Sequence, residues 1–467
     1  PPGMVGAEYN YTIPMDPTDE LRAAKFVAHN LPAGLVLNPV TGKISGRPKV
    51  VRTYIVTITP SNGSGFGTPV TDTLEVRAVP DELVGSFVAV APAESASPAL
   101  RLGARVDVTV TSKMTYSGKL YLGSATHSFT GGWLNAGVGL NLTNTFTIPR
   151  KGQTPITLTF DLDTVDFLLT GSLSDGAHTI NLDGWKKKWN ATEKPTSYKG
   201  YYTVALTAPP PGPADLSYPH GDGYVTFTVT DTGSPAIAGK TADGNAFTTS
   251  GGFVGPTGQL AIYNGLYGAT GGVINGKLNI NPAGGAPDFP HSSVSGSVAW
   301  EKRPAYTSFI YPNGFSPLTL TATGARYTNI LPGANVMGTN VLTKDVLVTF
   351  TGARVETGLQ LPDVNAQLTD KNVFVTDSLV SGLNPAATSL KLIPSTGIFT
   401  GSFTQFEDVD PGTKVKYVKR TAKIAGVIVR DPAAATGSGF GSYTLVQKPG
   451  TSTSEVLAGL VRLTDAP

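Results

Sequence analysis

Residues 30–48 read Asn-Leu-Pro-Ala-Gly-Leu-Val-Leu-Asn-Pro-Val-Thr-Gly-Lys-Ile-Ser-Gly-Arg-Pro, a run in which apolar residues and turn residues alternate. Pro-Ala-Gly, Asn-Pro and Thr-Gly favour tight turns, because proline presets φ and glycine accepts positive φ. These turns separate four apolar positions, which are Leu31, Leu35, Leu37 and Ile44. Two further segments, 54–59 and 72–77, alternate apolar and polar residues as half-buried strands do. The pattern predicts a small antiparallel sandwich of short strands.

The same stretch resembles the immunoglobulin-like (cadherin-like) domain of bacterial surface proteins. The hallmark of that family, LPxGLxLnxxTGxIsGxP, matches turn residues and core residues together in this run. The resemblance covers roughly residues 1–79 and implies an Ig-like β-sandwich in an extracellular context that builds stalks or arrays. It implies no activity, because a fold of this kind acts only through added sites.

The composition indicates an exported all-β protein. Among 467 residues there are 55 Gly and 36 Pro, and charged residues make up only 15%, yet 40% of the residues are hydrophobic. Because that hydrophobic fraction can supply buried cores, we interpret the glycines and prolines as punctuation between many short strands. The absence of Cys excludes disulfides and thiolate metal sites.

Charge and hydropathy argue against two classes of partner. The net charge is +2 and the longest basic run is Lys186-Lys187-Lys188, so we expect no nucleic-acid partner. No apolar run approaches the ~18 residues that a membrane helix requires. The chain begins at Pro1 without a signal peptide, which we interpret as a processed or excised product of an extracellular, bacterial cell-surface protein.

Residues 80–195 and 196–308 form two copies of one predicted unit. Phe129-Thr-Gly-Gly-Trp133 in the first copy corresponds to Phe247-Thr-Thr-Ser-Gly-Gly-Phe253 in the second. Trp185-Lys-Lys-Lys-Trp189 corresponds in the same way to Trp300-Glu-Lys-Arg303. A repeat of about 110 residues with six or seven strands is too long for a propeller blade. We therefore expect repeated antiparallel β-meander units, barrel- or sandwich-like.

Residues 309–467 are predicted to be a related but divergent C-terminal β module. The motif Thr396-Gly-Ile-Phe-Thr-Gly-Ser-Phe403, followed by further Gly-rich strands, resembles the terminal module of large secreted β-repeat proteins of Verrucomicrobia-like bacteria. That resemblance covers roughly residues 311–447 and implies surface location.

Residues with catalytic or metal-binding potential are few. The histidines show no metal-ligand spacing, and no nucleophile elbow follows a strand, so we predict no enzyme and no catalytic residue. Calcium is the one cofactor left open. The segment that holds Glu407, Asp408 and Asp410 offers hard oxygen ligands but lacks the 12-residue calcium-loop spacing.

Aromatic residues supply the candidates for glycan binding, because exposed rings stack on sugars. The candidate residues are Trp133, Trp185, Trp189, Tyr263 and Tyr267. The alternative is a core role, which the repetition of Trp with basic neighbours favours. A binding module should expose a row of these rings, whereas a structural building block should bury them.

The C-terminal segment 455–463 is an apolar strand that suits self-association. Donated to the edge of a neighbouring sandwich, it would join subunits head to tail, and such contacts generate open filaments. The candidate assembly residues are Val456, Leu457, Leu460, Val461 and Leu463. The alternative is that this strand pairs within its own module.

Together these features predict an exported, non-enzymatic structural protein, a building block of an extracellular fibre, layer or adhesive stalk. The alternative prediction is a carbohydrate-binding module detached from a larger secreted glycan-acting protein. The first reading predicts self-association, and the second predicts a glycan partner.

Overall fold

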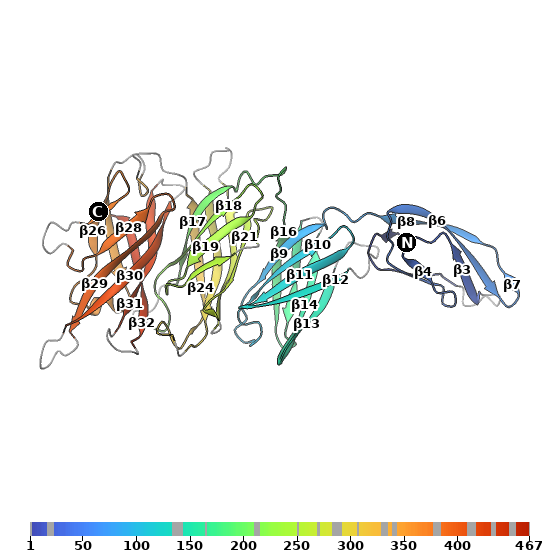
Figure 1. The fold of residues 1–467 in the computed structure, drawn as a ribbon, viewed down its shortest axis with the longest axis horizontal. Coiled ribbons are helices and arrows are strands. Elements are labelled where there is room, and N and C mark those ends of the chain that lie inside the picture. The colour runs from blue at the N-terminus through green and yellow to red at the C-terminus, as the bar shows by residue number, and fades with distance from the viewer. Residues whose placement is uncertain are drawn as a thin grey trace. The chain divides into compact units, whose positions relative to one another are not determined.

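The computed structural model describes fifteen stretches of the chain, and every structural statement below refers to them. They are residues 2–15, 23–132, 143–163, 166–209, 215–249, 252–268, 271–282, 292–305, 308–327, 335–338, 343–376, 384–408, 417–430, 436–447 and 454–466. These residues form β-strands joined by turns and loops, as Figure 1 shows. Within this described part, no helix is long and apolar enough to cross a membrane.

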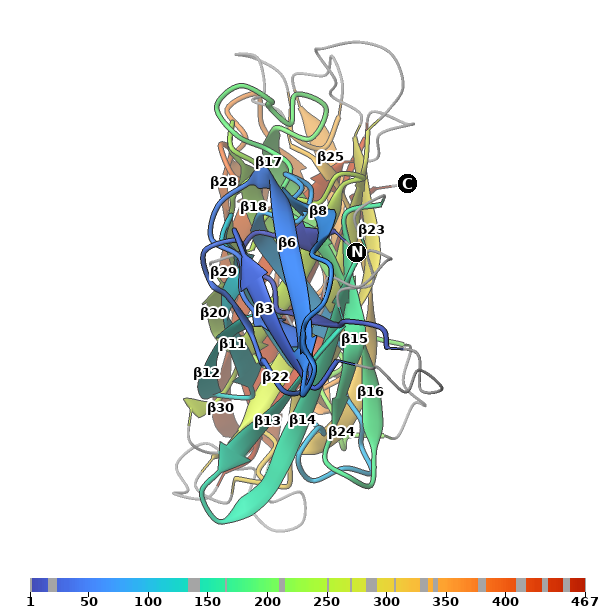
Figure 2. The same cartoon turned by 90° about the vertical axis from the view of Figure 1, so that its right-hand side faces the viewer.

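The N-terminal domain is a sandwich of two sheets. One sheet has the order β1-β8-β6-β3, with β7 paired to β6, and the other has the order β2-β5-β4. Figure 2 shows β3 and β6 side by side in the first sheet. The strands are β1 (Gly3–Met4), β2 (Tyr9–Thr12), β3 (Lys25–His29), β4 (Leu35–Leu37), β5 (Lys43–Gly46), β6 (Arg52–Asn62), β7 (Gly65–Phe66) and β8 (Val70–Arg77).

The predicted turns and core of this domain are confirmed. Gly34 adopts a φ of 97°, and a Cβ there would meet the Arg47 carbonyl oxygen at 2.0 Å, so that turn requires glycine. The apolar positions between the turns meet in one core, formed by Tyr9, Leu35, Ile44, Val56 and Leu74, with Leu31 and Leu37 packed against it.

Three eight-stranded antiparallel sheets follow, which we call barrels 1, 2 and 3. Barrel 1 consists of β9 (Gly85–Ala91), β10 (Ala104–Val110), β11 (Thr115–Leu122), β12 (Ala125–Gly132), β13 (Asn144–Arg150), β14 (Gln153–Leu162), β15 (Leu168–Ser174) and β16 (Thr179–Lys186). Barrel 2 consists of β17 (Gly200–Thr207), β18 (Gly223–Val229), β19 (Pro235–Lys240), β20 (Ala246–Thr249), β21 (Gln259–Gly265), β22 (Gly272–Asn281), β23 (Ser293–Lys302) and β24 (Phe315–Arg326).

Barrel 3 consists of β25 (Lys344–Thr351), β26 (Val364–Leu368), β27 (Phe374–Thr376), β28 (Ser389–Ile393), β29 (Ile398–Asp408), β30 (Tyr417–Arg430), β31 (Gly437–Val446) and β32 (Val456–Asp465). The 3₁₀ helix η2 (Val355–Thr357) lies between β25 and β26.

The three barrels share one topology. Strands follow one another as a meander, and the first strand of each barrel pairs with the eighth, as β9 does with β16. In barrels 2 and 3 the fourth and fifth strands also approach each other, which brings the two ends of each sheet together. Alternation fills the interiors: Ile156, Leu158 and Phe160 on β14 are fully buried, while Thr157 and Thr159 between them are partly exposed.

The structure corrects two details of the predicted repeats. Each sheet has eight strands rather than six or seven, because the last strand returns to pair with the first. The second sheet therefore runs past the predicted boundary at residue 308 and includes β24. Trp185 lies on the eighth strand of barrel 1, whereas Trp300 lies on the seventh strand of barrel 2. The two tryptophans are not equivalent.

The described chain divides into two compact units, each treated by itself below. Unit 1 comprises Pro1–Ala91, Arg105–Tyr121 and Ala125–Lys187, and thus holds the N-terminal sandwich and most of barrel 1. Unit 2 comprises Pro92–Ala104, Leu122–Ser124 and Lys188–Pro467, and holds barrels 2 and 3.

Candidate functional site: the junction of barrels 2 and 3

Barrels 2 and 3 meet through strands that are buried on both faces. On β17, Val204 points into barrel 2, whereas the neighbouring Thr203 and Ala205 face outward and are nevertheless fully buried. Ala205 packs with Val427 and Val429 of β30, and Tyr224, Ile398 and Phe440 surround this contact. Small side chains let two strongly twisted sheets approach closely. The outer surface of barrel 2 therefore packs directly against the outer surface of barrel 3.

A connecting segment before β18 fastens the backbone of barrel 2 to that of barrel 3. The His220 backbone N–H donates to the Ala458 carbonyl oxygen at 3.3 Å, and the Asp222 N–H donates to the Gly441 carbonyl oxygen at 3.2 Å. Between them, a Cβ on Gly221 would meet the Gly459 carbonyl oxygen at 2.4 Å. Only glycine permits this approach of two main chains.

A buried ion pair lies beside this backbone contact. The Asp222 carboxylate is 2% exposed and pairs with the Arg462 guanidinium of β32, which lies 4.7 Å from the centre of the Phe440 ring. Burial lowers the pKa of Arg462 from its usual value. Removing one partner of such a pair leaves an uncompensated charge in a poorly solvated site.

Two tyrosines of barrel 2 bind the turn between β28 and β29. The Tyr201 hydroxyl donates to the Thr396 carbonyl oxygen at 3.1 Å, and the Tyr327 hydroxyl donates to the Pro394 carbonyl oxygen at 2.6 Å. Burial raises the pKa of both hydroxyls, so both remain protonated donors at neutral pH. Gly397 in this turn has a φ of 69°, and a Cβ there would clash with the Tyr327 ring.

The connection between β23 and β24 forms a third attachment. The buried Lys302 ammonium donates to the Ser308 hydroxyl at 3.0 Å and to the Ile310 carbonyl oxygen. The Tyr311 hydroxyl accepts a hydrogen bond from the Ala458 N–H of β32 at 3.0 Å. Burial lowers the pKa of Lys302, and the nearby Asp243 carboxylate opposes that shift. The polar groups of this connection thus bind both barrels.

The predicted glycan-binding aromatics are mostly in cores. Trp185, Trp189 and Tyr263 are buried. Tyr267 is partly buried, and its hydroxyl donates to Asp243 at 2.7 Å and accepts from the Trp300 indole N–H at 2.9 Å. Trp133 lies outside the described residues. The four candidates that the structure describes therefore form no exposed row of rings.

Of the three predicted calcium ligands, only Glu407 has a side chain that the structure describes. The Glu407 carboxylate lies 3.5 Å from the guanidinium of Arg420, a residue that is 1% exposed. Asp408 belongs to β29, but its side chain is outside the described set, as is the whole of Asp410. Among the residues that are described, no three acidic or histidine side chains gather as a metal site.

The predicted assembly strand is β32, a strand of the sheet that forms barrel 3. β32 pairs with β25 on one side and with β31 on the other, so both of its hydrogen-bonding edges are used. Leu457, Val461 and Leu463 are buried in the barrel interior. This is the pairing within its own module that the sequence analysis holds as the alternative to strand donation.

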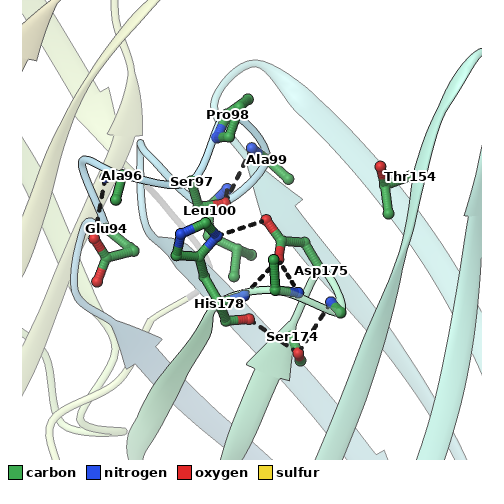
Figure 3. A network of polar contacts seen from close by, with 12 residues as sticks. Glu94, Ala96, Ser97, Pro98, Ala99, Leu100, Thr154, Ser174, Asp175 and His178 are labelled. Atoms are coloured by element: carbon green, nitrogen blue, oxygen red, sulfur yellow. Dashed lines mark hydrogen bonds and ion pairs between the residues drawn. The ribbon is translucent and has the colours of Figure 1, made fainter.

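Figure 3 shows two polar turns whose residues include a serine, an aspartate and a histidine. In the first turn the Ser97 hydroxyl oxygen accepts backbone N–H groups of Ala99 and Leu100. In the second, Asp175 accepts the backbone N–H of His178 at 2.7 Å and lies 3.5 Å from its ring nitrogen. The contacts drawn join residues at most four apart, as in the bond that the Ser174 hydroxyl donates to the His178 carbonyl oxygen at 2.9 Å, so they stabilise the turns themselves.

Comparison with known proteins agrees with the N-terminal architecture. Residues 2–77 match the family described as "Putative Ig domain". Residues 2–77 form an Ig-like domain. No curated protein matches the chain. A solved structure that aligns with it is a tryptophan-to-alanine mutant of the vaccine antigen transferrin-binding protein B from Haemophilus parasuis.

That alignment covers 95% of this chain and 86% of the other, with 10% identity and a TM-score of 0.20. The resemblance of residues 311–447 to secreted β-repeat proteins remains a prediction.

Sequence reasoning did not find the junction. Asp222 and Arg462 carry no motif, and each reads as a solvated charge beside apolar residues. The one available signal was the run of apolar residues 424–429, interrupted only by Gly426. A strand without polar alternation is typical of burial on both faces.

Proposed function

We propose that this protein is an exported, non-enzymatic structural component of the bacterial cell surface, a building block of a fibre, layer or adhesive stalk. The observation that carries the proposal is the junction, where barrels 2 and 3 share one continuous buried core. Surface proteins of this kind must keep a fixed spacing outside the cell, and a continuous core serves that purpose. The Ig-like domain supports the same assignment.

The filled barrel interiors also support a structural role. An eight-stranded barrel is either packed with side chains or hollow enough for one small ligand. In barrel 3 the interior holds the large side chains of Phe350, Phe403 and Tyr443, whose ring centres lie 4.9 to 5.6 Å apart. An interior filled with large side chains supports a structural role for barrel 3.

The test compares the opening of the two barrels in the full-length protein. Native-state hydrogen exchange should show β17 and β32 opening with the same free energy, because the junction couples them. Asp222→Asn should lower both values by about 3 kcal/mol, since it leaves Arg462 without its counter-charge. Asp345→Asn, at an exposed position of β25, is the matched control. Independent opening of the two strands would remove the basis of the proposal.

Assembly requires a second experiment. Negative-stain images of the full-length protein at increasing concentration should show ordered filaments or layers. Only monomers at all concentrations would contradict the building-block role while leaving the rigid unit intact. Retardation by soluble polysaccharides in affinity electrophoresis would instead favour the carbohydrate-binding alternative.

A further inference from the structure

A histidine lies in the backbone contact that joins barrels 2 and 3. The His220 backbone N–H donates to the Ala458 carbonyl oxygen of β32 at 3.3 Å. The ring rests on the connection that follows β25, because a Cβ on Gly352 would meet the His220 Nδ1 atom at 3.3 Å. The Gly352 carbonyl oxygen in turn accepts a hydrogen bond from the Tyr443 hydroxyl at 2.5 Å. His220 is therefore held between the segment before β18 and the backbone of barrel 3.

The His220 ring lies in poorly hydrated surroundings. Its Nε2 atom is buried, and the centre of the Tyr218 ring lies 5.3 Å from the centre of the imidazole. Leu216 and Tyr218, on the same segment, pack against the apolar cluster that barrels 2 and 3 share. A neutral imidazole suits this place, whereas a proton on the buried nitrogen would put a charge away from water.

The charged groups around the ring oppose this effect only in part. Among the described residues, the Asp215 and Glu356 carboxylates and the Asp215 backbone favour the protonated form of His220. Both acidic residues are exposed, so water screens their attraction to the ring. Two residues along the chain, the Asp222 carboxylate is paired with Arg462. Burial is the largest influence on His220 and lowers its pKa.

Acid should favour the open form of the junction. Separation of the barrels would expose the His220 ring to water and restore its ordinary pKa of about 6.5. Because the pKa is lower in the closed junction, the open form binds the proton more readily. The stability contributed by the neutral ring is present above the ordinary pKa. It is lost as the pH falls through the lower pKa of the closed form.

We propose that His220 makes the junction of barrels 2 and 3 sensitive to acid: protonation of its ring loosens the contact with Gly352 and Ala458, so that the barrels open more readily. The inference rests on the junction that carries the proposed structural role. It goes beyond that role because it adds a control by the pH outside the cell.

The test compares the full-length parent with His220→Asn by native-state hydrogen exchange at pH 7.5 and pH 5.5, with intrinsic exchange rates corrected for pH. Asn cannot ionise, and its amide can still donate to the Asp215 backbone. On acidification, the opening equilibrium constants of β17 and β32 should rise at least about threefold more in the parent than in the variant. A stability loss from the substitution itself is the same at both pH values and cancels in this comparison.

His29→Asn, at an exposed position of the Ig-like domain, is the matched control and should keep the acid response of the parent. An NMR titration of the His220 ring in the parent is the second measurement, and the signal that His220→Asn removes assigns it. We expect its midpoint below about 6.5.

Equal acid responses of the parent and His220→Asn, or a titration midpoint at or above the ordinary value, would overturn the proposal. Independent opening of β17 and β32 at pH 7.5 would contradict both this proposal and the structural role. Coupled opening at pH 7.5 together with equal acid responses would contradict the acid sensitivity alone.

Discussion

At the scale of single residues, unit 2 buries a carboxylate, that of Glu301, whose burial an ion pair only partly compensates. Glu301 is completely buried and pairs with Arg101, which is one-third exposed. The other oxygen of that carboxylate has no hydrogen-bond partner among the described residues. Burial is the largest influence on Glu301 and raises its pKa, and the Arg101 guanidinium only partly opposes this. The ionised carboxylate of Glu301 therefore lowers the stability of the folded state at neutral pH.

We predict that Glu301→Gln changes stability in a pH-dependent direction. The pKa of Glu301 is higher in the folded state than in the unfolded state. The protonated carboxyl therefore contributes stability that is fully present below the unfolded-state pKa, and this contribution is lost as the pH rises through the raised folded-state pKa. The variant cannot ionise, so its melting temperature relative to the parent should be higher at pH 7 than at pH 4. A difference of about 2 °C or more is expected for a unit of this size.

Thermal unfolding at the two pH values measures this effect. Glu455→Gln, at an exposed position of the same unit, provides the control and should show the same offset at both pH values. An offset for Glu301→Gln that falls from pH 4 to pH 7 would show that the Arg101 ion pair outweighs burial.

At the scale of elements, the connection between β25 and β26 is held by a buried amide of the barrel wall. Val355 of η2 is 3% exposed within the core of barrel 3. The fully buried Gln405 side chain donates to the Val355 carbonyl oxygen at 2.7 Å and to the Gln360 carbonyl oxygen at 2.9 Å. Ala353 and Arg354 just before η2 adopt φ of 51° and 56°, a strained region for residues with a Cβ. The Gln405 contacts offset this strain.

Gln405→Ala should release this connection from the barrel. The substitution leaves two carbonyl oxygens without their donors, which costs about 1–3 kcal/mol. Limited trypsin digestion should then cleave after the exposed Arg354 much faster than in the parent. Gln367→Ala, which removes an exposed amide on β26, is the control and should leave cleavage unchanged. Equal cleavage of the parent and Gln405→Ala would show that the connection is held by other contacts.

At the scale of the whole molecule, stability in unit 2 depends on contacts between barrels as well as within them. One cluster of buried apolar residues extends from Trp189 to Leu463 and includes the interiors of both barrels. The three attachments at the junction use backbone groups, an ion pair and tyrosine hydroxyls, so they resist separation in different ways. Barrels 2 and 3 should therefore unfold together.

Gly221→Ala tests the close approach at the junction without changing any charge. A Cβ at this position would meet the Gly459 carbonyl oxygen and the Ser442 side chain at 2.4 Å, so the barrels must move apart. We expect a loss of about 1–3 kcal/mol in the unfolding free energy measured by denaturant titration. Gly252→Ala should cost little, because among the described residues the atom nearest to its Cβ would be the Ala261 carbonyl oxygen at 4.0 Å. Equal losses for the two variants would show that close packing at Gly221 does not limit stability.

The sequence by itself determined the all-β class and the Ig-like domain, because both depend on residues that are close together in the chain. A turn such as the one at Gly34 depends on residues that are neighbours in the chain, and alternation along β6 and β14 reports which face is buried. These signals need no knowledge of distant residues. They therefore predicted the sandwich of residues 1–79 and the meander order of the strands that follow.

Only the tertiary structure decided how the strands close and what the barrels contact. The pairing of β17 with β24 and the place of β32 between β25 and β31 join segments far apart in the chain. The same separation hid the junction, since Asp222 and Arg462 each resemble an ordinary surface charge until the fold buries them together. A side chain's burial depends on the surface that meets it, and that surface comes from elsewhere in the sequence.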